Sequence, residues 1–344
     1  YSFYNYEFNK SVSILSEVRE LHPEHPTVHF TWAVSKWLRA QAYNGIEESY
    51  DTLFASLEKI IPVYDDYVEQ YPDEPEYRLY AAAAKGVKAR VHLGKKEWIS
   101  VVMEGIKGYS GIRAVHNKNP ELWDAYFPIG ILNFYAGNMS GFVQFLAGFI
   151  GIDADKALGM EQMTITAEKG KFAWIEASQI VVFVYLWMDQ DFEKALTISQ
   201  RLVDRIPKSI YNQHLYTESL IRFNRLDEAE ANLRLTNEMA ERLPSLSKKG
   251  WLPTLKYHDA LLSFYKGDTD RAMEMVTQSI NEFNTELDTP LGFGYLLRGN
   301  IHDLRGNRSL AVEDYRSAVR LDNYSAAMTE ARGYLRRPFK PRVE

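Results

Sequence analysis

Apolar side chains recur along most of this chain at intervals of three and four residues, the spacing that places them on one face of an α-helix. No segment sustains the period-two alternation of apolar and polar residues that is typical of a half-buried strand. The pattern therefore predicts an all-α protein with essentially no sheet.

Four segments in the second half of the chain repeat one pattern. In each, a helix ends at a short polar or glycine turn, and an alanine follows five residues after the turn residue. Successive alanines are 34, 43 and 39 residues apart, and the first interval is the length of a tetratricopeptide repeat. Small residues allow the two helices of a hairpin to approach closely, so we expect these alanines to be buried. The turn residues are Gln190, Asn224, Gly267 and Gly306, and the alanines are Ala195, Ala229, Ala272 and Ala311.

The first half follows the same plan less regularly. The run from Phe8 to Pro23 has the spacing of Phe192 to Pro207, so we expect the chain to open on the second helix of a repeat. Two hairpins are predicted next, over residues 27–71 with a turn at Asn44-Gly45 and over residues 74–115 with Gly94 in the turn. Met103 is expected on the packing face of the second of these hairpins.

Linkers rich in Gly, Ser or Pro are absent from the sequence, which predicts one continuous array. We expect residues 1–344 to form a single right-handed α-solenoid of tetratricopeptide-type hairpins, interrupted near the middle by an apolar helical insert. Its predicted parts are irregular repeats over 1–119, the insert over 120–170, regular repeats over 171–333 and a basic tail over 334–344.

The stretch 125–152 contains no Asp, Glu, Lys or Arg. It is long enough to span a membrane, but polar and helix-interrupting residues at 128, 133, 137, 138, 140, 141 and 144 divide it. We expect two short buried helices, with Phe134, Phe142, Phe145 and Phe149 inside the fold. Contact with a membrane or a partner through 125–152 is the alternative, and it is not favoured.

Two further stretches carry a family resemblance. The first is the alanine-rich segment 82–90, and the second runs from Glu121-Leu122-Trp123-Asp124-Ala125-Tyr126 to Gly151-Ile152-Asp153 and on to residues 170–177. Together they resemble a bacterial family of tetratricopeptide-repeat proteins that is distantly similar to the inclusion-body-clearance and tetratricopeptide-repeat-39 proteins. The usual Gly-Gly-Asp of that family is Gly151-Ile152-Asp153 here. The resemblance implies a bacterial helical interaction scaffold without catalytic residues.

The composition of the chain argues against nucleic-acid binding and excludes functions that need cysteine. The net charge of −6 gives no general attraction to nucleic acid, which we do not expect as a partner. The absence of cysteine excludes disulfides, thiolate metal sites and a cysteine nucleophile. The sequence does not decide the cellular compartment, and we expect a soluble protein of the bacterial cell envelope, periplasm or cytoplasm.

Candidate chemistry is sparse. No nucleophile elbow, phosphate-binding loop, dinucleotide fingerprint or zinc-protease motif occurs, so no catalytic residue, no cofactor and no enzymatic activity is predicted. His22, His25 and His29 have a spacing that can bind metal, but the prolines among them are typical of a helix junction, and no metal site is expected. The acidic stretch 46–77 is expected to form a solvated face or an acidic docking patch, and the basic tail a frayed end.

The remaining candidate is the concave surface, which the first helices of stacked hairpins line. Aromatic side chains mixed with hydrogen-bonding groups suit an extended or helical peptide. We therefore predict a non-catalytic scaffold that binds a protein or peptide through this face. The alternative is a helical protein that binds a small molecule or lipid with the aromatic insert. The predicted peptide-binding residues are Tyr211, His214, Glu218, Arg222, Tyr257, Phe264, Asn300 and Asp303.

Overall fold

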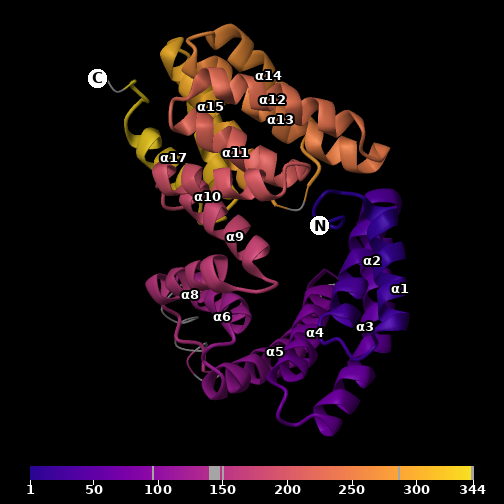
Figure 1. Cartoon of the computed structure of the whole chain (residues 1–344). Helices are drawn as coiled ribbons and strands as arrows, with labels where there is room; N and C mark the ends of the chain where they lie inside the picture. The colour runs from indigo at the N-terminus through magenta and orange to yellow at the C-terminus, as the bar shows by residue number, and fades with distance from the viewer. Residues whose placement is uncertain (95–96, 139–147, 149–150, 286, 342–344) are drawn as a thin grey trace. The chain divides into compact units, whose positions relative to one another are not determined.

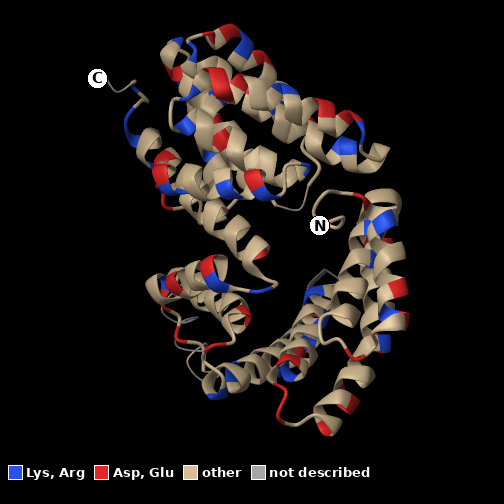
Figure 2. Cartoon of the chain, in the orientation of Figure 1, with Lys and Arg blue, Asp and Glu red and all other residues tan. Residues whose placement is uncertain are grey.

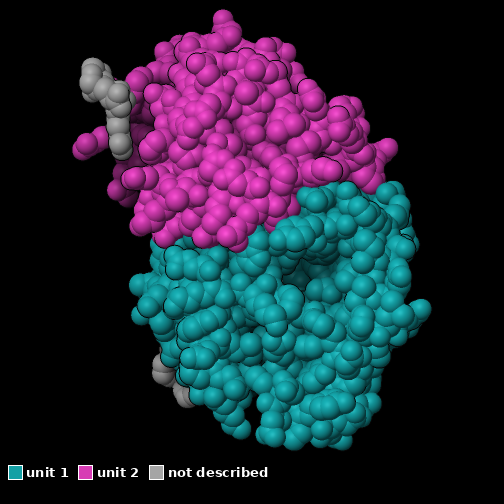
Figure 3. All heavy atoms as spheres, viewed as in Figure 1, with its two compact units in different colours: residues 1–181 teal, residues 182–344 magenta. Residues whose placement is uncertain are grey.

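The computed structural model describes residues 1–94, 97–138, 148, 151–285 and 287–341. Every regular element in these ranges is helical, which confirms the predicted fold class. The chain divides into two compact units, Tyr1–Val181 and Val182–Glu344, called unit 1 and unit 2 below (Figure 3).

Unit 1 contains most of the helices of the first half of the chain (Figure 1). They are α1 (Phe8–Leu21), α2 (Val28–Asn44), α3 (Ile46–Gln70), α4 (Pro75–Gly94), α5 (Trp98–Lys118), the 3₁₀ helix η1 (Trp123–Ala125), α6 (Tyr126–Gly137) and α8 (Lys156–Lys169). Helix α9 (Trp174–Trp187) begins in unit 1 and ends in unit 2.

Unit 2 continues with helices of similar length (Figure 1). They are α10 (Phe192–Arg205), α11 (Ile210–Arg222), α12 (Leu226–Glu241), α13 (Ser245–Tyr265), α14 (Thr269–Glu282), α15 (Thr289–Leu304), α16 (Arg308–Arg320) and α17 (Ala326–Arg336). Short connections join them into the hairpins α11–α12, α13–α14 and α15–α16.

The first helices of these hairpins form a layer of their own in unit 2. Helix α11 packs on α13, α13 on α15, and α15 on α17, whereas each second helix packs on its own hairpin partner and on the next first helix. We call α11, α13, α15 and α17 the inner layer. Direct contact between successive first helices is what stacks the hairpins into a solenoid.

The predicted register of small residues is confirmed. Ala195, Ala229, Ala272 and Ala311 are each 0% exposed. The same close approach holds at Gly299 on α15, where an added methyl group would lie 2.6 Å from Cε1 of Tyr315 on α16. The hairpins therefore close around small side chains, as the spacing predicts.

The turn residues explain why α9, α11, α13 and α15 end where they do. Gln190, Asn224, Gly267 and Gly306 all have positive φ, between 56° and 84°. This left-handed conformation ends a helix and suits glycine, asparagine and other polar residues. After two of these turns an aspartate, Asp191 or Asp268, caps the next helix.

One bond joins the two ends of unit 2. The side-chain amide of Gln190, in the turn before α10, donates a 2.6 Å hydrogen bond to Glu330 on α17. The two residues are 140 positions apart in the sequence. We call this contact the clasp.

The hairpins of unit 1 also follow the prediction. Helix α1 precedes the hairpin α2–α3, which turns at Gly45 with φ 100°, and α4–α5 is the next hairpin. Met103 is 54% exposed, so its predicted place on the packing face is wrong. Small residues bring α4 and α5 close together, since a methyl group on Gly108 would lie 2.7 Å from Cα of Gly86, and Leu79 and Ile112 belong to the buried cluster beside them.

In the insert, α6 and α8 pack tightly against each other. A methyl group on Gly130 would lie 2.8 Å from the carbonyl oxygen of Gly159, and one on Gly159 would lie 2.6 Å from that of Gly130. Phe134 is 0% exposed, as predicted. Phe142, Phe145 and Phe149 lie outside the described residues. Among the helices that are described, none combines the length and apolarity needed to cross a membrane.

Unit 1 is tied together by contacts between its first and last segments. The hydroxyl of Tyr4 donates a hydrogen bond to the carboxylate of Glu176 on α9. Nearby, the buried carboxylate of Asp124 accepts hydrogen bonds from the backbone nitrogens of Phe172, at 3.1 Å, and Ala173, at 3.0 Å. Side chains that are distant in sequence therefore hold the start of α9 inside unit 1.

Candidate functional site: the inner layer and turn edge of unit 2

The predicted peptide-binding residues all lie on inner-layer helices. Helix α11 carries four of them at three- and four-residue spacing, which places them on one face. The other residues are on α13 and α15, near the ends of those helices or facing α11. They are Tyr211, His214, Glu218 and Arg222 on α11, Tyr257 and Phe264 on α13, and Asn300 and Asp303 on α15.

Glu218 is the centre of a buried ionic network. Its carboxylate Oε1 accepts hydrogen bonds from Nη2 of Arg222, at 3.2 Å, and from the hydroxyl of Tyr257, at 3.2 Å. Arg222 also donates to the Tyr257 hydroxyl at 2.9 Å. The second carboxylate oxygen of Glu218 lies 3.4 Å from Nε2 of His258. The network joins α11 to α13.

The neighbours of Glu218 fix its charge. Burial alone would raise the pKa of this carboxyl group, but His258 and the guanidinium of Arg222 together lower the pKa to about 2. Burial, with a smaller effect of His258, lowers the pKa of His214 to about 3. At neutral pH the site therefore holds a carboxylate and a guanidinium beside a neutral His214.

Aromatic rings surround His214. Its imidazole is stacked on Trp187 at 5.4 Å and on His258 at 5.1 Å between ring centroids, and the ring of Trp251 lies 5.5 Å away. These side chains come from α9, α11 and α13. The stack therefore fixes the spacing of α9, α11 and α13.

A second cluster surrounds Asp303 on α15. Its Oδ2 is 2.9 Å from Nη1 of Arg308, 2.9 Å from the hydroxyl of Tyr315 and 2.8 Å from the backbone nitrogen of Phe339. Asn300 Oδ1 is 3.0 Å from the same tyrosine hydroxyl. Burial and the bond to Asp303 raise the pKa of Tyr315, so this hydroxyl remains a donor.

Burial separates the predicted residues into two groups. His214, Glu218, Tyr257 and Asn300 are buried, and they bond or stack with other inner-layer side chains. Tyr211, Arg222 and Phe264 are partly exposed, whereas Asp303 is partly exposed only at its backbone, because its side chain is 1% exposed. Contact between a peptide and the predicted residues stays a prediction, and it now falls mainly on Tyr211, Arg222 and Phe264. The buried carboxylate of Glu218 and the buried imidazoles of His214 and His258 contact one another and join α11 to α13.

The first helices end in a feature that was not predicted. Phe223, Tyr265 and Leu304 stand at or immediately after the ends of α11, α13 and α15, and they are 46%, 37% and 40% exposed. We call this row of helix ends the turn edge of unit 2. The sequence does carry a signal, because each large apolar residue comes one or two positions before the turn residue Asn224, Gly267 or Gly306.

The predicted frayed end is wrong for the described part of the basic tail. Residues 334–336 belong to α17, and Phe339 is partly buried. The ring centroid of Phe339 is 5.4 Å from that of Tyr334 and 6.4 Å from that of Phe264. A frayed end would lack such contacts, and the aromatic residue within a basic stretch is the signal that could have predicted them.

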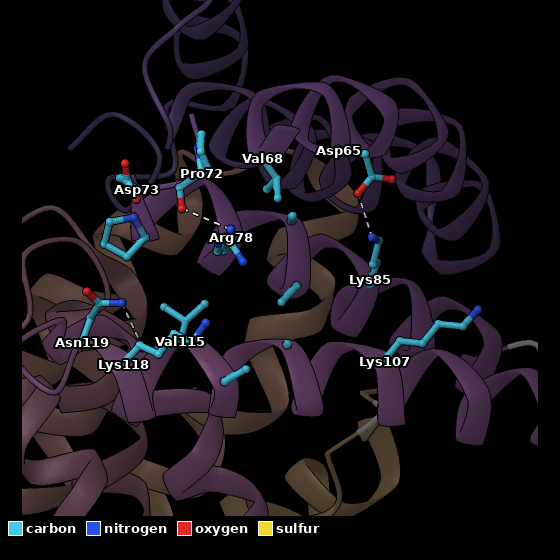
Figure 4. Close-up of a pocket in the computed structure, with 15 residues that line it drawn as sticks. Asp65, Val68, Pro72, Asp73, Arg78, Lys85, Lys107, Val115, Lys118 and Asn119 are labelled. Carbon is cyan, nitrogen blue, oxygen red and sulfur yellow. Dashed lines mark hydrogen bonds and ion pairs between the residues drawn. The ribbon is translucent and has the colours of Figure 1, made fainter. Parts of the chain in front are cut away.

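Unit 1 contains a pocket of about 440 Å³ between α3, α4 and α5 (Figure 4). Its lining includes the small residues Ala82 and Gly111 and the cations Arg78, Lys85, Lys107 and Lys118. Lys85 is paired with Asp65 at 2.8 Å, Lys107 with Glu104 at 3.2 Å, and Arg78 donates to a backbone carbonyl. Arg78, Lys85 and Lys107 are thus engaged within the chain.

The histidines and acidic residues that the sequence offered as metal-binding or docking candidates do not form a common site in the described residues. Arg19 donates to Nδ1 of His29 at 2.8 Å, and Nε2 of His29 lies 2.7 Å from the carbonyl oxygen of Pro23, so this imidazole is engaged. Within the described ranges no group of His, Asp and Glu side chains has the arrangement to hold a metal ion. From the acidic stretch, Glu58 and Asp65 pair with Lys88 and Lys85 of α4. Acidic and basic residues are interspersed along the helices of both units (Figure 2).

Comparison with protein-family models gave no match, and comparison with curated proteins gave none. The chain is similar to the solved structure of a tetratricopeptide repeat protein from Parabacteroides merdae, with 16% identity, a TM-score of 0.46 and coverage of 85% of this chain and 96% of that chain. It is also similar to a human IFIT1 dimer with PPP-AAAA, with 13% identity, a TM-score of 0.43 and coverage of 95% of this chain and 71% of that chain. Its similarity to yeast Tom70 has 10% identity, a TM-score of 0.42 and coverage of 95% of this chain and 85% of that chain.

The geometry of the chain itself defines the class of protein. Paired helices, left-handed turn residues and a buried alanine five residues later make this an α-solenoid of tetratricopeptide-type hairpins. Membership of the narrower bacterial family stays a prediction.

Proposed function

We propose that the chain is a non-catalytic scaffold that binds an extended segment of a partner protein along the inner layer and turn edge of unit 2. The turn edge carries this proposal. Phe223, Tyr265 and Leu304 recur at the same place in three consecutive hairpins, and each is more than a third exposed. Large exposed apolar residues in a row are typical of a protein–protein interaction surface.

The framework beneath the turn edge supports the proposal. Arg222, next to Phe223, is held by Glu218 and Tyr257, and only 13% of its side chain is exposed. Phe264, next to Tyr265, packs against Phe339. Because these neighbours are held in place, the exposed side chains are presented in a fixed arrangement, which lowers the entropic cost of binding.

Selection from a random peptide library displayed on phage tests the proposal. The purified chain is expected to enrich peptides that share a common sequence, and a synthetic copy is expected to bind in solution. Binding is expected to fall about tenfold or more in the double variant Phe223→Ser, Tyr265→Ser, as for the loss of central apolar contacts.

The matched control removes apolar residues of similar exposure from second helices. Leu235 on α12 and Leu310 on α16 are 43% and 44% exposed. The double variant Leu235→Ser, Leu310→Ser is expected to bind as the wild type does. Selection without any shared sequence, or equal loss of binding in both double variants, would contradict the turn edge as the binding surface.

A further inference from the structure

Beyond α17 the chain places a short extended stretch on the turn edge. Arg337 ends α17 with φ −139° and ψ 132°, an extended conformation, and Pro338 follows it. The backbone nitrogen of Phe339 then donates a 2.8 Å hydrogen bond to Asp303, and its ring lies between those of Phe264 and Tyr334. We call Asp303, Phe264 and Tyr334 the Phe339 seat.

The seat is built to accept an extended chain. Arg308 donates to Asp303 and also to the carbonyl oxygens of Tyr334, at 2.6 Å, and Leu335, at 3.1 Å. It thereby fixes the carboxylate against the end of α17. A fixed carboxylate that accepts a backbone N–H can bind any residue except proline at that point, while the aromatic walls select the side chain.

The chain's own stretch covers the seat but leaves the residues around it exposed. Phe339 is partly buried, but Arg337, Pro338, Lys340 and Pro341 on either side are exposed. Tyr265 and Leu304, next to two of the seat residues in sequence, also remain exposed at 37% and 40%. A longer extended segment bound in the same seat would also cover the side chains of Tyr265 and Leu304.

We propose that the Phe339 seat binds a partner protein's extended segment in which an aromatic residue follows a proline, and that residues 338–341 occupy the seat until the partner displaces them. This inference rests on the proposed function and names the partner's chemistry. Proline keeps the segment extended before binding, which reduces the ordering cost. The tethered stretch competes at an effective concentration on the order of millimolar, so it sets a threshold for partners.

A synthetic peptide of residues 335–344 with a fluorescent label is the probe. Anisotropy is measured against the full chain and against a variant from which residues 338–344 are deleted. The peptide is expected to bind the deletion variant about tenfold or more tightly than the full chain, since the seat is vacant only in the variant. A peptide with Phe339→Ala is expected to lose binding about tenfold or more.

Three substitutions complete the test. In the full chain, Phe339→Ala is expected to increase peptide binding without removing any backbone, which keeps the test valid should the deletion variant fold poorly. In the deletion variant, Phe264→Ala is expected to weaken binding, whereas Leu310→Ala on α16 is expected to leave it unchanged.

Equal binding of the wild-type and Phe339→Ala peptides, or no binding to either vacant-seat variant, would overturn the inference. Formation of dimers by the full chain that Phe339→Ala abolishes would also overturn it, in favour of exchange of this stretch between two copies. The proposed function fails separately, since its library selection depends on Phe223 and Tyr265 and requires no peptide with this sequence.

Discussion

The hydroxyl of Tyr4 donates a hydrogen bond to the carboxylate of Glu176, across 172 positions of the sequence. Burial raises the pKa of Glu176 above its ordinary value of 4.5, although the bond from Tyr4 opposes this. Burial, together with Glu176, also raises the pKa of Tyr4, so the tyrosine remains a donor. The two ends of unit 1 thus meet at a buried carboxyl group whose charge is costly.

Two variants separate the bond from the charge. Tyr4→Phe leaves a buried acceptor unpaired and is expected to lower the free energy of unfolding by about 1–3 kcal/mol. Glu176→Gln keeps an oxygen that accepts the bond and removes the charge. Because the folded-state pKa is raised, the contribution of Glu176 to stability is lost as the pH rises above about 4.5, whereas a glutamine at this position makes no pH-dependent contribution. We therefore expect Glu176→Gln to unfold at a higher urea concentration than the wild type at pH 7. Wild-type behaviour of Tyr4→Phe would show that the bond contributes nothing.

The buried alanines provide a test of hairpin packing. Ala311→Leu is expected to cost about 1–3 kcal/mol, because the larger side chain has no space between α15 and α16. The neighbouring change Leu310→Ala affects a residue that is 44% exposed and should stay within about 0.5 kcal/mol of the wild type. Thermal melting followed by circular dichroism measures both. Equal melting temperatures for the two variants would refute the register.

A glycine pair tests the crossing of α6 and α8. Gly159→Ala places a methyl group 2.6 Å from the carbonyl oxygen of Gly130 and is expected to cost about 1–3 kcal/mol. Gly250→Ala, in α13, meets no atom within 4 Å and should stabilise its helix by up to about 1 kcal/mol. Opposite shifts of the urea midpoint are expected, and a neutral Gly159→Ala would mean that the two helices are farther apart.

Acid should weaken unit 2 through His214. Its pKa is about 3 in the folded chain and 6.5 when unperturbed, so the unfolded chain takes up the proton first as the pH falls. Stability is therefore lost between about pH 6.5 and pH 3, and the loss at pH 5 is about 2 kcal/mol. Glu218 adds a loss only below its ordinary pKa of 4.5, because its folded-state pKa is about 2.

His214→Phe keeps a flat ring between Trp187 and His258 and has no proton to take up. Urea unfolding at pH 7 and pH 5 is expected to give a smaller difference for this variant than for the wild type. A pH dependence as steep as that of the wild type would assign the effect to another group.

The pairing of helices within each hairpin could be predicted from the sequence, but the angle between successive hairpins could not. The turn residues and Ala195, Ala229, Ala272 and Ala311 follow from the close approach within each hairpin, which sequence spacing records directly. The same spacing places Glu218 and Tyr257 on the first-helix face, where they lie. Their burial depends on the angle between successive hairpins, which arises from contacts between side chains far apart in sequence.

Other features depend on distant contacts in the same way. Neither Tyr4 nor Glu176 is part of a repeat motif, so no local pattern indicates their bond. Phe339 stands in a basic stretch whose charges suggest exposure, yet one ring and one backbone nitrogen hold it against α13, α15 and α17. That residues 1–344 form a single solenoid stays a prediction.

The clasp between Gln190 and Glu330 gives unit 2 an order of assembly. Contacts within and between adjacent hairpins are local, and local contacts form early because they close short loops. The clasp closes a loop of 140 residues and needs both α17 and the turn before α10 to be in place. It can form only after every intervening hairpin has stacked, so a fluorescence pair placed at these two positions would report the last step of folding rather than the first.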